Sequence, residues 1–176
     1  MCTDVERPAA RIVAGMVTFV STPVDDPLAH EMLSAYFAER DATFPRAGAY
    51  RTVFPDPPRF LNPNGDFVIG YDDDTEIGLA CGGIRLLEAE SSEVGPLMRF
   101  EIKHLWVHQD ARGRGLGRAL LTELESRAAG LGGRVVVLDT NESLQAAGGL
   151  YRSSGYTGVA PYNDNPNATH WFRKRL

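Results

Sequence analysis

The sequence is poor in cysteine and in positive charge. Its 176 residues include two cysteines, Cys2 near the start and Cys81 within an apolar run, so we expect no disulfide and a reducing compartment. Lysine and arginine together number 18 against 23 aspartate and glutamate residues, which gives a formal net charge of −5. No large basic face can be assembled from this composition. Nucleic acid and anionic membrane surfaces are therefore not expected as main partners.

Long hydrophobic segments are missing as well. No apolar stretch approaches the ~20 residues of a membrane-spanning helix, so no membrane partner is expected. The first residues also lack the charged start and apolar run of a signal peptide, which favours a cytoplasmic protein. What remains is a globular composition in a chain the size of one domain. We expect a flexible tail over residues 1–10 and a single domain over residues 11–176.

The histidines form no pattern typical of a metal site. His104 and His108 are four residues apart, but this spacing aligns two ligands only on a helix, and both residues lie on a predicted strand entering a turn. Cysteine and carboxylate partners at ligand spacing are missing too. The acidic run at residues 72–74 is typical of a solvated hairpin turn. We therefore predict no metal cofactor.

The most informative stretch is a glycine-rich turn between a predicted strand over residues 100–107 and a predicted helix over residues 116–128. Such a turn presents free backbone N–H groups to an anion at the start of the helix. Its glycines allow a close approach, and its arginines add positive charge. These residues are Arg112, Gly113, Arg114, Gly115, Gly117 and Arg118. The pattern predicts a binding site for a diphosphate.

The spacing within this turn separates several nucleotide sites. A P-loop ends in Gly-Lys-Ser/Thr, whereas residues 117–119 read Gly-Arg-Ala, so no residue is available to hold Mg²⁺. The dinucleotide fingerprint needs G-x-G-x-x-G, and here the third glycine comes one residue early. The pattern present is Arg-x-x-Gly-x-Gly over residues 112–117. A nucleotide-binding protein is disfavoured but stays an alternative.

The rest of the chain alternates between strand and helix patterns, which predicts an α/β fold with a βαβ unit over residues 100–139. Residues 45–65 hold five prolines and several aromatic side chains, and residues 160–167 form a polar loop rich in asparagine, so both segments are expected to be irregular. The expected strands cover residues 15–20, 67–71, 76–87, 100–107, 134–139 and 169–174, with a further one beginning at residue 155. One helix is expected to start after Asp25 or Asp26, and two more are expected over residues 116–128 and 143–153.

The second half of the chain resembles the GNAT acyltransferase superfamily over about residues 66–176. The likeness rests on the Arg-x-x-Gly-x-Gly turn, on Asp-Thr-Asn at residues 139–141, and on Leu-Tyr-Arg-Ser-Ser-Gly-Tyr at residues 150–156. It implies a mixed central sheet of about six to seven strands flanked by about four helices. It also implies acetyl-CoA as cosubstrate and transfer of the acetyl group to a primary amine of a small molecule or peptide, by direct attack in a ternary complex. A homodimer is common in the family.

The resemblance further assigns residues to the cofactor. The turn binds the pyrophosphate of CoA, the backbone of Val107 pairs with the pantetheine amide, and Asn141 hydrogen-bonds the pantetheine arm, although a helix cap at Asn141 looks identical in sequence. The expected cofactor contacts are Leu105, Trp106, Val107, Arg112, Gly113, Arg114, Gly115, Leu116, Gly117, Arg118, Asn141 and Tyr151.

Acyl transfer to an amine requires a proton acceptor for the amine and benefits from a proton donor for the departing thiolate. Glu101 stands where several members have a general base, with a surface Glu–Lys strand face beside Lys103 as the alternative. A bulge in this strand, which the family has, changes the geometry beyond Lys103. Tyr151 stands where the family has the proton donor, with a core tyrosine as the alternative.

Two other readings of the function stay open. A catalytically inactive acyl-CoA sensor or interaction module explains the same turn, as does a nucleotide-binding protein. The acceptor depends on residues 45–65 and 160–168, which the sequence leaves unassigned.

Overall fold

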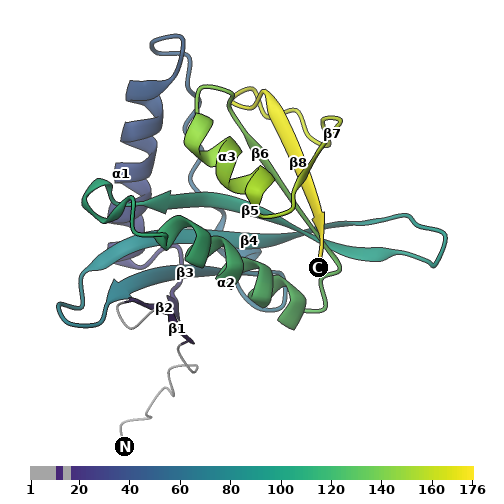
Figure 1. Cartoon of the computed structure of the whole chain (residues 1–176), viewed down its shortest axis with the longest axis horizontal. Helices are drawn as coiled ribbons and strands as arrows, with labels where there is room; N and C mark the ends of the chain where they lie inside the picture. The colour runs from purple at the N-terminus through teal and green to yellow at the C-terminus, as the bar shows by residue number, and fades with distance from the viewer. Residues whose placement is uncertain (1–10, 14–16) are drawn as a thin grey trace, which may run out of the picture.

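The computed structural model describes residues 11–13 and 17–176, which form one sheet with helices on both faces (Figure 1). The predicted tail over residues 1–10 lies outside the described residues. Within them the sheet has eight strands in the order β1-β2-β3-β4-β5-β6-β8-β7. The strands are β1 (Arg11–Val13), β2 (Val17–Ser21), β3 (Gly65–Asp72), β4 (Gly78–Glu90), β5 (Leu97–Val107), β6 (Val135–Thr140), β7 (Thr157–Val159) and β8 (His170–Arg175).

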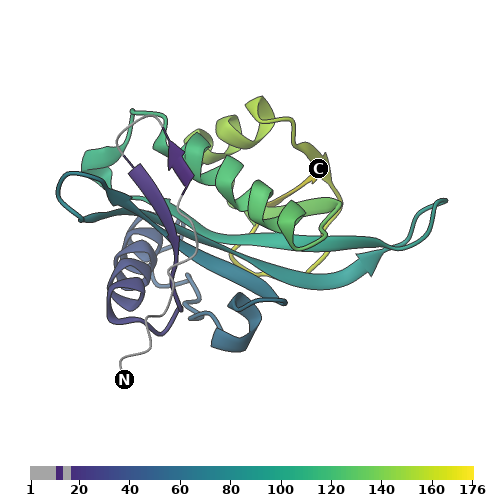
Figure 2. The same ribbon diagram turned by 90° about the horizontal axis from the view of Figure 1, so that it is seen from below.

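Three α-helices and two short 3-10 helices complete the described chain: α1 (Pro27–Thr43), η1 (Pro57–Phe60), η2 (Gln109–Ala111), α2 (Leu116–Gly130) and α3 (Gln145–Ser153). Viewed along the sheet, α1 and η1 cover one face, while α2 and α3 cover the other (Figure 2). Each face has its own apolar core, because β4 and β5 alternate side chains between α1 on one side and α2 on the other.

The α/β fold predicted from the sequence is confirmed, with small differences in the number of elements. The short strand β1 extends the sheet to eight strands within the described residues, and η1 and η2 stand in place of a fourth α-helix. Asp26, rather than Asp25, caps α1, because its carboxylate accepts from the N–H groups of Leu28 (2.9 Å) and Ala29 (3.4 Å). None of the described helices is both long enough and apolar enough to cross a bilayer.

The centre of the sheet is where the predicted βαβ unit leaves an opening. Strands β5 and β6 are parallel and pair from Arg99 to Glu101, whereas β5 continues unpaired with β6 to Val107. A bulge on β5 lies past this point. Trp106 pairs with Cys81 and Lys103 with Gly83, so two residues oppose one, and His104 takes a positive φ of 56°. The bulge turns β5 away from β6 and opens the sheet.

Candidate active site

The glycine-rich turn connects β5 to α2 and has the geometry of an anion site. Gly113 and Gly115 have φ angles of 77° and 79°, a backbone conformation that favours glycine, and Gly115 is the N-cap of α2. The backbone N–H groups of residues 113–117 donate to no acceptor within the described chain. Free N–H groups at the start of a helix attract an anion, because the helix dipole places partial positive charge there.

The guanidinium of Arg112 is bound by the protein itself. Its Nε donates to the carbonyl oxygen of Val107 (2.9 Å), and its Nη2 donates to both carboxylate oxygens of Glu39 on α1 (2.7 and 2.6 Å). The Trp106 indole also donates to Glu39 (2.9 Å). Partial burial alone raises the pKa of Glu39, but the hydrogen bonds from Arg112 and Trp106 outweigh it and lower that pKa. Arg112 therefore clamps the turn to α1.

The other two arginines of the turn are placed differently. Arg118 donates to the hydroxyls of Ser153 (2.7 Å) and Ser154 (3.0 Å), and so ties α2 to the end of α3. Arg114 is exposed and forms no ion pair with the described residues. Of the three arginines, Arg114 is thus the one whose guanidinium is available to a phosphate.

A cleft of about 820 Å³ opens beside the turn, over the gap between β5 and β6. It is bounded by α1, the segment before η1, the bulged part of β5, α3 and the loop between β7 and β8. The expected cofactor residues Leu105, Trp106, Val107, Arg112, Asn141 and Tyr151 all line it, whereas residues 113–118 and Glu101 do not. Six of the predicted residues are therefore brought together in one cleft.

Tyr151 is a buried residue of α3 that also lines the cleft, so the core reading and the site reading both apply to it. Its side chain is 6% exposed and contacts the rings of Tyr156 and Phe172. Burial and the charge of Asp139 raise the pKa of Tyr151 to about 12. The hydroxyl is therefore protonated at neutral pH, which is the state that a proton donor needs.

Asn141 lies at the end of β6 and is 5% exposed. Its amide nitrogen donates to the backbone oxygen of Asn167 (3.0 Å), and its amide oxygen accepts from the N–H of Ser143 (3.1 Å). The N-cap of α3 is Leu144, so the helix-cap reading of Asn141 is wrong. Asn141 instead connects the cleft-facing end of β6 to the β7–β8 loop.

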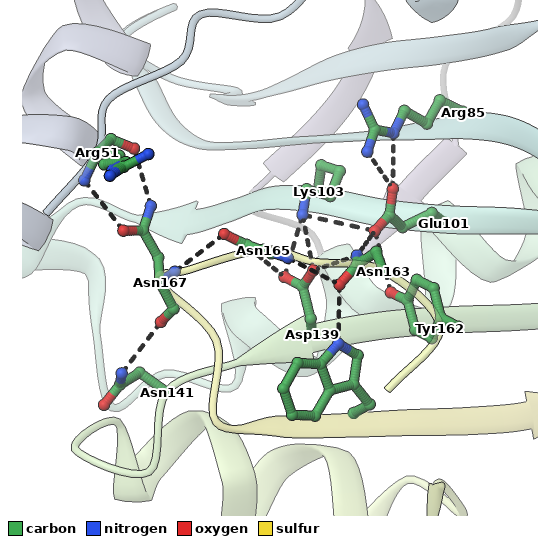
Figure 3. Close-up of polar contacts among 11 residues, drawn as sticks. Arg51, Arg85, Glu101, Lys103, Asp139, Asn141, Tyr162, Asn163, Asn165 and Asn167 are labelled. Atoms are coloured by element: carbon green, nitrogen blue, oxygen red, sulfur yellow. Dashed lines mark hydrogen bonds and ion pairs between the residues drawn. The ribbon is translucent and has the colours of Figure 1, made fainter. Parts of the chain in front are cut away.

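Glu101 is fully buried and surrounded by donors (Figure 3). Oxygen Oε2 accepts from Arg85 Nε (2.6 Å) and lies 2.5 Å from Arg85 Nη2. Oxygen Oε1 accepts from the Tyr162 hydroxyl (3.0 Å) and the Asn163 amide (3.1 Å), with Lys103 Nζ at 3.5 Å. The alternative of a surface strand face is wrong. These contacts occupy both carboxylate oxygens of Glu101, which does not line the cleft.

Asp139 is a cleft-lining carboxylate that was expected only as part of the Asp-Thr-Asn motif. It accepts from Lys103 Nζ (3.0 and 3.1 Å) and from the amides of Asn163 (2.7 Å) and Asn165 (3.1 Å). Burial alone raises the pKa of Asp139, but Lys103 and the two amides together lower it. Asp139 is therefore an ionised group whose charge is balanced by Lys103.

The asparagines of the β7–β8 loop were missed as site residues. Asn163, Asn165 and Asn167 stand at alternate positions, and the side-chain oxygens of Asn163 and Asn165 each accept from the N–H two residues on. Asn167 also exchanges two hydrogen bonds with the backbone of Arg51, at 2.8 and 3.0 Å (Figure 3). This pairing joins the two segments that were expected to decide the acceptor. The alternate spacing of the asparagines is the sequence signal for the loop.

His104 occupies the bulge of β5 and faces the aromatic wall of the cleft. Its ring contacts those of Tyr36, Phe37 and Phe60, with centroids 5.5 to 5.9 Å apart. Burial and the charges of Lys103 and Arg85 lower the pKa of His104 to about 3, so the imidazole is neutral. Among the described residues, no three histidine, cysteine or acidic side chains are grouped as metal ligands.

The turn, the split between β5 and β6 and the cleft beside Tyr151 define an acyl-CoA-dependent acyltransferase fold. The sequence model of the acetyltransferase (GNAT) family matches residues 28–156. The chain belongs to this family.

Individual proteins give a consistent picture. An uncharacterised N-acetyltransferase of Schizosaccharomyces pombe is 39% identical over 66 residues, which span 38% of this chain and 40% of that relative. A GNAT-family acetyltransferase from Staphylococcus aureus superposes with a TM-score of 0.69 at 14% identity, covering 91% of this chain and 99% of that one. Arabidopsis thaliana Naa50, solved with the bisubstrate analogue CoA-Ac-MVNAL, superposes with a TM-score of 0.63 at 17% identity, covering 91% and 99%. These likenesses support the fold.

Proposed function

We propose that this protein is an acetyl-CoA-dependent N-acetyltransferase that acts on a primary amine by direct attack in a ternary complex. The observation that carries the proposal is the row of free N–H groups at residues 113–117, next to a cleft that contains a buried, protonated tyrosine. The first feature suits the pyrophosphate of CoA, and the second suits protonation of its departing thiolate. A cytoplasmic location and a homodimer stay predictions from the sequence.

In this proposal Tyr151 is the proton donor, and acetyl-CoA is held by the free N–H groups of the turn and by the backbone of Val107, which lines the cleft. Arg112, Trp106 and Glu39 fix the turn against α1 rather than touching phosphate. The amide nitrogen of Asn141 has a second hydrogen that does not bond to Asn167, and in this proposal it donates to the pantetheine arm of CoA. The acceptor is a small amine or a peptide, and the Naa50 complex with a peptide joined to CoA supports the peptide option.

The base is the part of the proposal that the geometry constrains most. Glu101 can serve as base only through a water that replaces Tyr162 or Asn163, because four groups donate to its oxygens or lie beside them. His104 is a poor base, because its low pKa means that the imidazole does not retain a proton at neutral pH. An amine that enters the cleft already neutral needs no strong base.

Binding of CoA is the first test. CoA at about 100 times its Kd adds ~2.7 kcal/mol to the free energy of unfolding. For a domain of this size, the melting temperature then rises by about 5–11 °C. No shift with CoA or acetyl-CoA contradicts the proposal, and a larger shift with ATP or NAD favours the nucleotide-binding alternative.

Thiol release separates an enzyme from a CoA sensor. We expect acetyl-CoA to release free CoA with at least one member of a panel of amines, amino acids and peptides. Tyr151→Phe is expected to lower kcat by about 100-fold or more and to change CoA affinity by no more than about twofold, because the hydroxyl acts on the leaving group. Tyr71→Phe, on β3 and outside the cleft lining, is the matched control. CoA binding without thiol release favours the sensor.

A further inference from the structure

Arg40, near the end of α1, is a buried cation that forms no ion pair with the described residues, although its charge contributes to lowering the pKa of Glu39. Arg40 is 7% exposed, and its Nη1 atom is buried without a hydrogen-bond partner among the described residues. No described carboxylate lies within ion-pair distance of it, and the ring of Tyr50 lies 5.7 Å from its guanidinium carbon. Arg40 lines the cleft.

The surroundings of Arg40 are rich in aromatic hydroxyls and lack available acid. Tyr36, one helical turn earlier, and Tyr151 both lie close enough for the charge of Arg40 to act on their hydroxyls. The adjacent Glu39 is already bound by Arg112 and Trp106. Arginine carries a fixed positive charge, so the burial of this side chain is the burial of a charge.

An unpaired buried charge is strongly unfavourable, and an apolar residue of similar size fills such a position at lower cost. The arrangement is therefore expected to be completed by an anion from outside the chain. The charge of the cleft favours the same ligand. Six arginine and lysine side chains line it against three aspartates and glutamates, although the protein as a whole carries −5.

Two sources of anionic oxygen are open to a ternary complex: the phosphates of CoA, and a carboxylate where the acceptor has one. The turn at residues 113–117 already offers free N–H groups to the phosphates, with Arg114 beside them. Arg40 instead faces the ring of Tyr50. The residue that follows Tyr50, Arg51, pairs with Asn167 where the two irregular segments meet (Figure 3), and both of these residues line the cleft. The position of Arg40 is thus on the acceptor side.

We propose that Arg40 binds a carboxylate of the acceptor, so that the substrates are amines that also carry a carboxylate, such as free amino acids. This inference rests on the proposed function and specifies its acceptor. The guanidinium offers a planar pair of N–H donors that matches the two oxygens of a carboxylate.

The test compares matched acceptors in the full-length protein saturated with CoA or acetyl-CoA. The probes are L-amino acids and the corresponding L-amino acid amides, which differ in the carboxylate, with thermal shift and thiol release as readouts. We expect the wild type to prefer at least one acid over its amide by about 10- to 100-fold, the range of a charge-assisted hydrogen-bond pair. Arg40→Met should abolish the preference, and Arg40→Lys should retain part of it.

Arg46→Met is the control, because Arg46 is exposed, lies six residues further along and does not line the cleft. It should retain the full preference. Arg40→Met removes an unpaired buried charge, so the ligand-free variant should melt no lower than the wild type. A lower melting temperature contradicts the absence of an internal partner.

A second arm separates the two sources of anionic oxygen. If Arg40→Met weakens acetyl-CoA but not S-acetyl-pantetheine, which lacks the phosphates, Arg40 serves the cofactor and the inference is wrong. A panel in which no acid exceeds its amide overturns it as well. A wild type that CoA fails to stabilise refutes the proposed function together with this inference, whereas CoA binding without a carboxylate preference refutes the inference alone.

Discussion

Replacing Glu101 by glutamine tests whether this residue is a structural anchor. The substitution keeps the shape of the side chain and removes its charge. The new NH₂ group must face either Arg85 or the donors of Tyr162 and Asn163, so one donor is set against another. Breaking a buried ion pair costs about 3–5 kcal/mol when one charge remains.

The lower end of that range applies here. The Arg85 side chain is 26% exposed and regains water, and Lys103 keeps Asp139 at 3.0 Å. We therefore expect Glu101→Gln to lower the free energy of unfolding by about 3 kcal/mol. This corresponds to a fall in melting temperature of roughly 6–12 °C for a domain of this size. Urea denaturation and calorimetry measure both quantities.

Glu88→Gln is the control, because Glu88 is exposed on the same hairpin and its change should stay within about 0.5 kcal/mol. A Glu101→Gln variant as stable as the wild type refutes the anchor. Turnover of the folded variant separates the two roles. A loss of kcat of about 100-fold or more identifies Glu101 as the base, whereas an anchor raises KM for the acceptor as the β7–β8 loop loosens.

Two further predictions concern the turn and the ionised groups. Gly115→Ala should lower the free energy of unfolding by about 1–2 kcal/mol and weaken CoA binding, because an alanine is strained at φ 79°. Gly149→Ala, within α3 and with open space around it, should instead raise that free energy by about 0.5–1 kcal/mol. Equal effects of the two variants in urea denaturation contradict this reasoning. The pH dependence should show two losses. The lowered pKa of Asp139 contributes stability above pH ~4, and this stability disappears as the pH falls. The pKa of Tyr151, raised to about 12, contributes stability below pH ~10 that disappears as the pH rises. A urea midpoint that is flat from pH 3 to 11 contradicts both signs.

The turn could be predicted because its signals are local. The strand, the alternate glycines and the helix follow one another within about 30 residues, and each leaves its own periodicity or spacing in the sequence. Their conformations in the structure follow the same order, with positive φ at Gly113 and Gly115. Where a candidate site consists of backbone N–H groups, neighbouring residues are sufficient to predict its conformation.

The roles of Arg112 and Glu101 could not be predicted in the same way. Arg112 is bound by Glu39, 73 positions away, and Glu101 is bound by Asn163, 62 positions away. These partners meet only once α1 and the β7–β8 loop have packed against the sheet. In the sequence each is an ordinary polar residue, so a charge next to a binding motif looks free although the folded protein has already paired it.

The clamp on α1 links the two halves of the proposed reaction. Glu39 and Arg40 are successive residues, so their side chains point about 100° apart around the helix. Glu39 reaches Arg112 and fixes the turn proposed to bind acetyl-CoA, while Arg40 lines the cleft where we propose that it binds the acceptor. A rotation of α1 that moves one side chain must move the other. In the proposed reaction, the position of the acceptor is therefore tied to the position of acetyl-CoA through one helical segment.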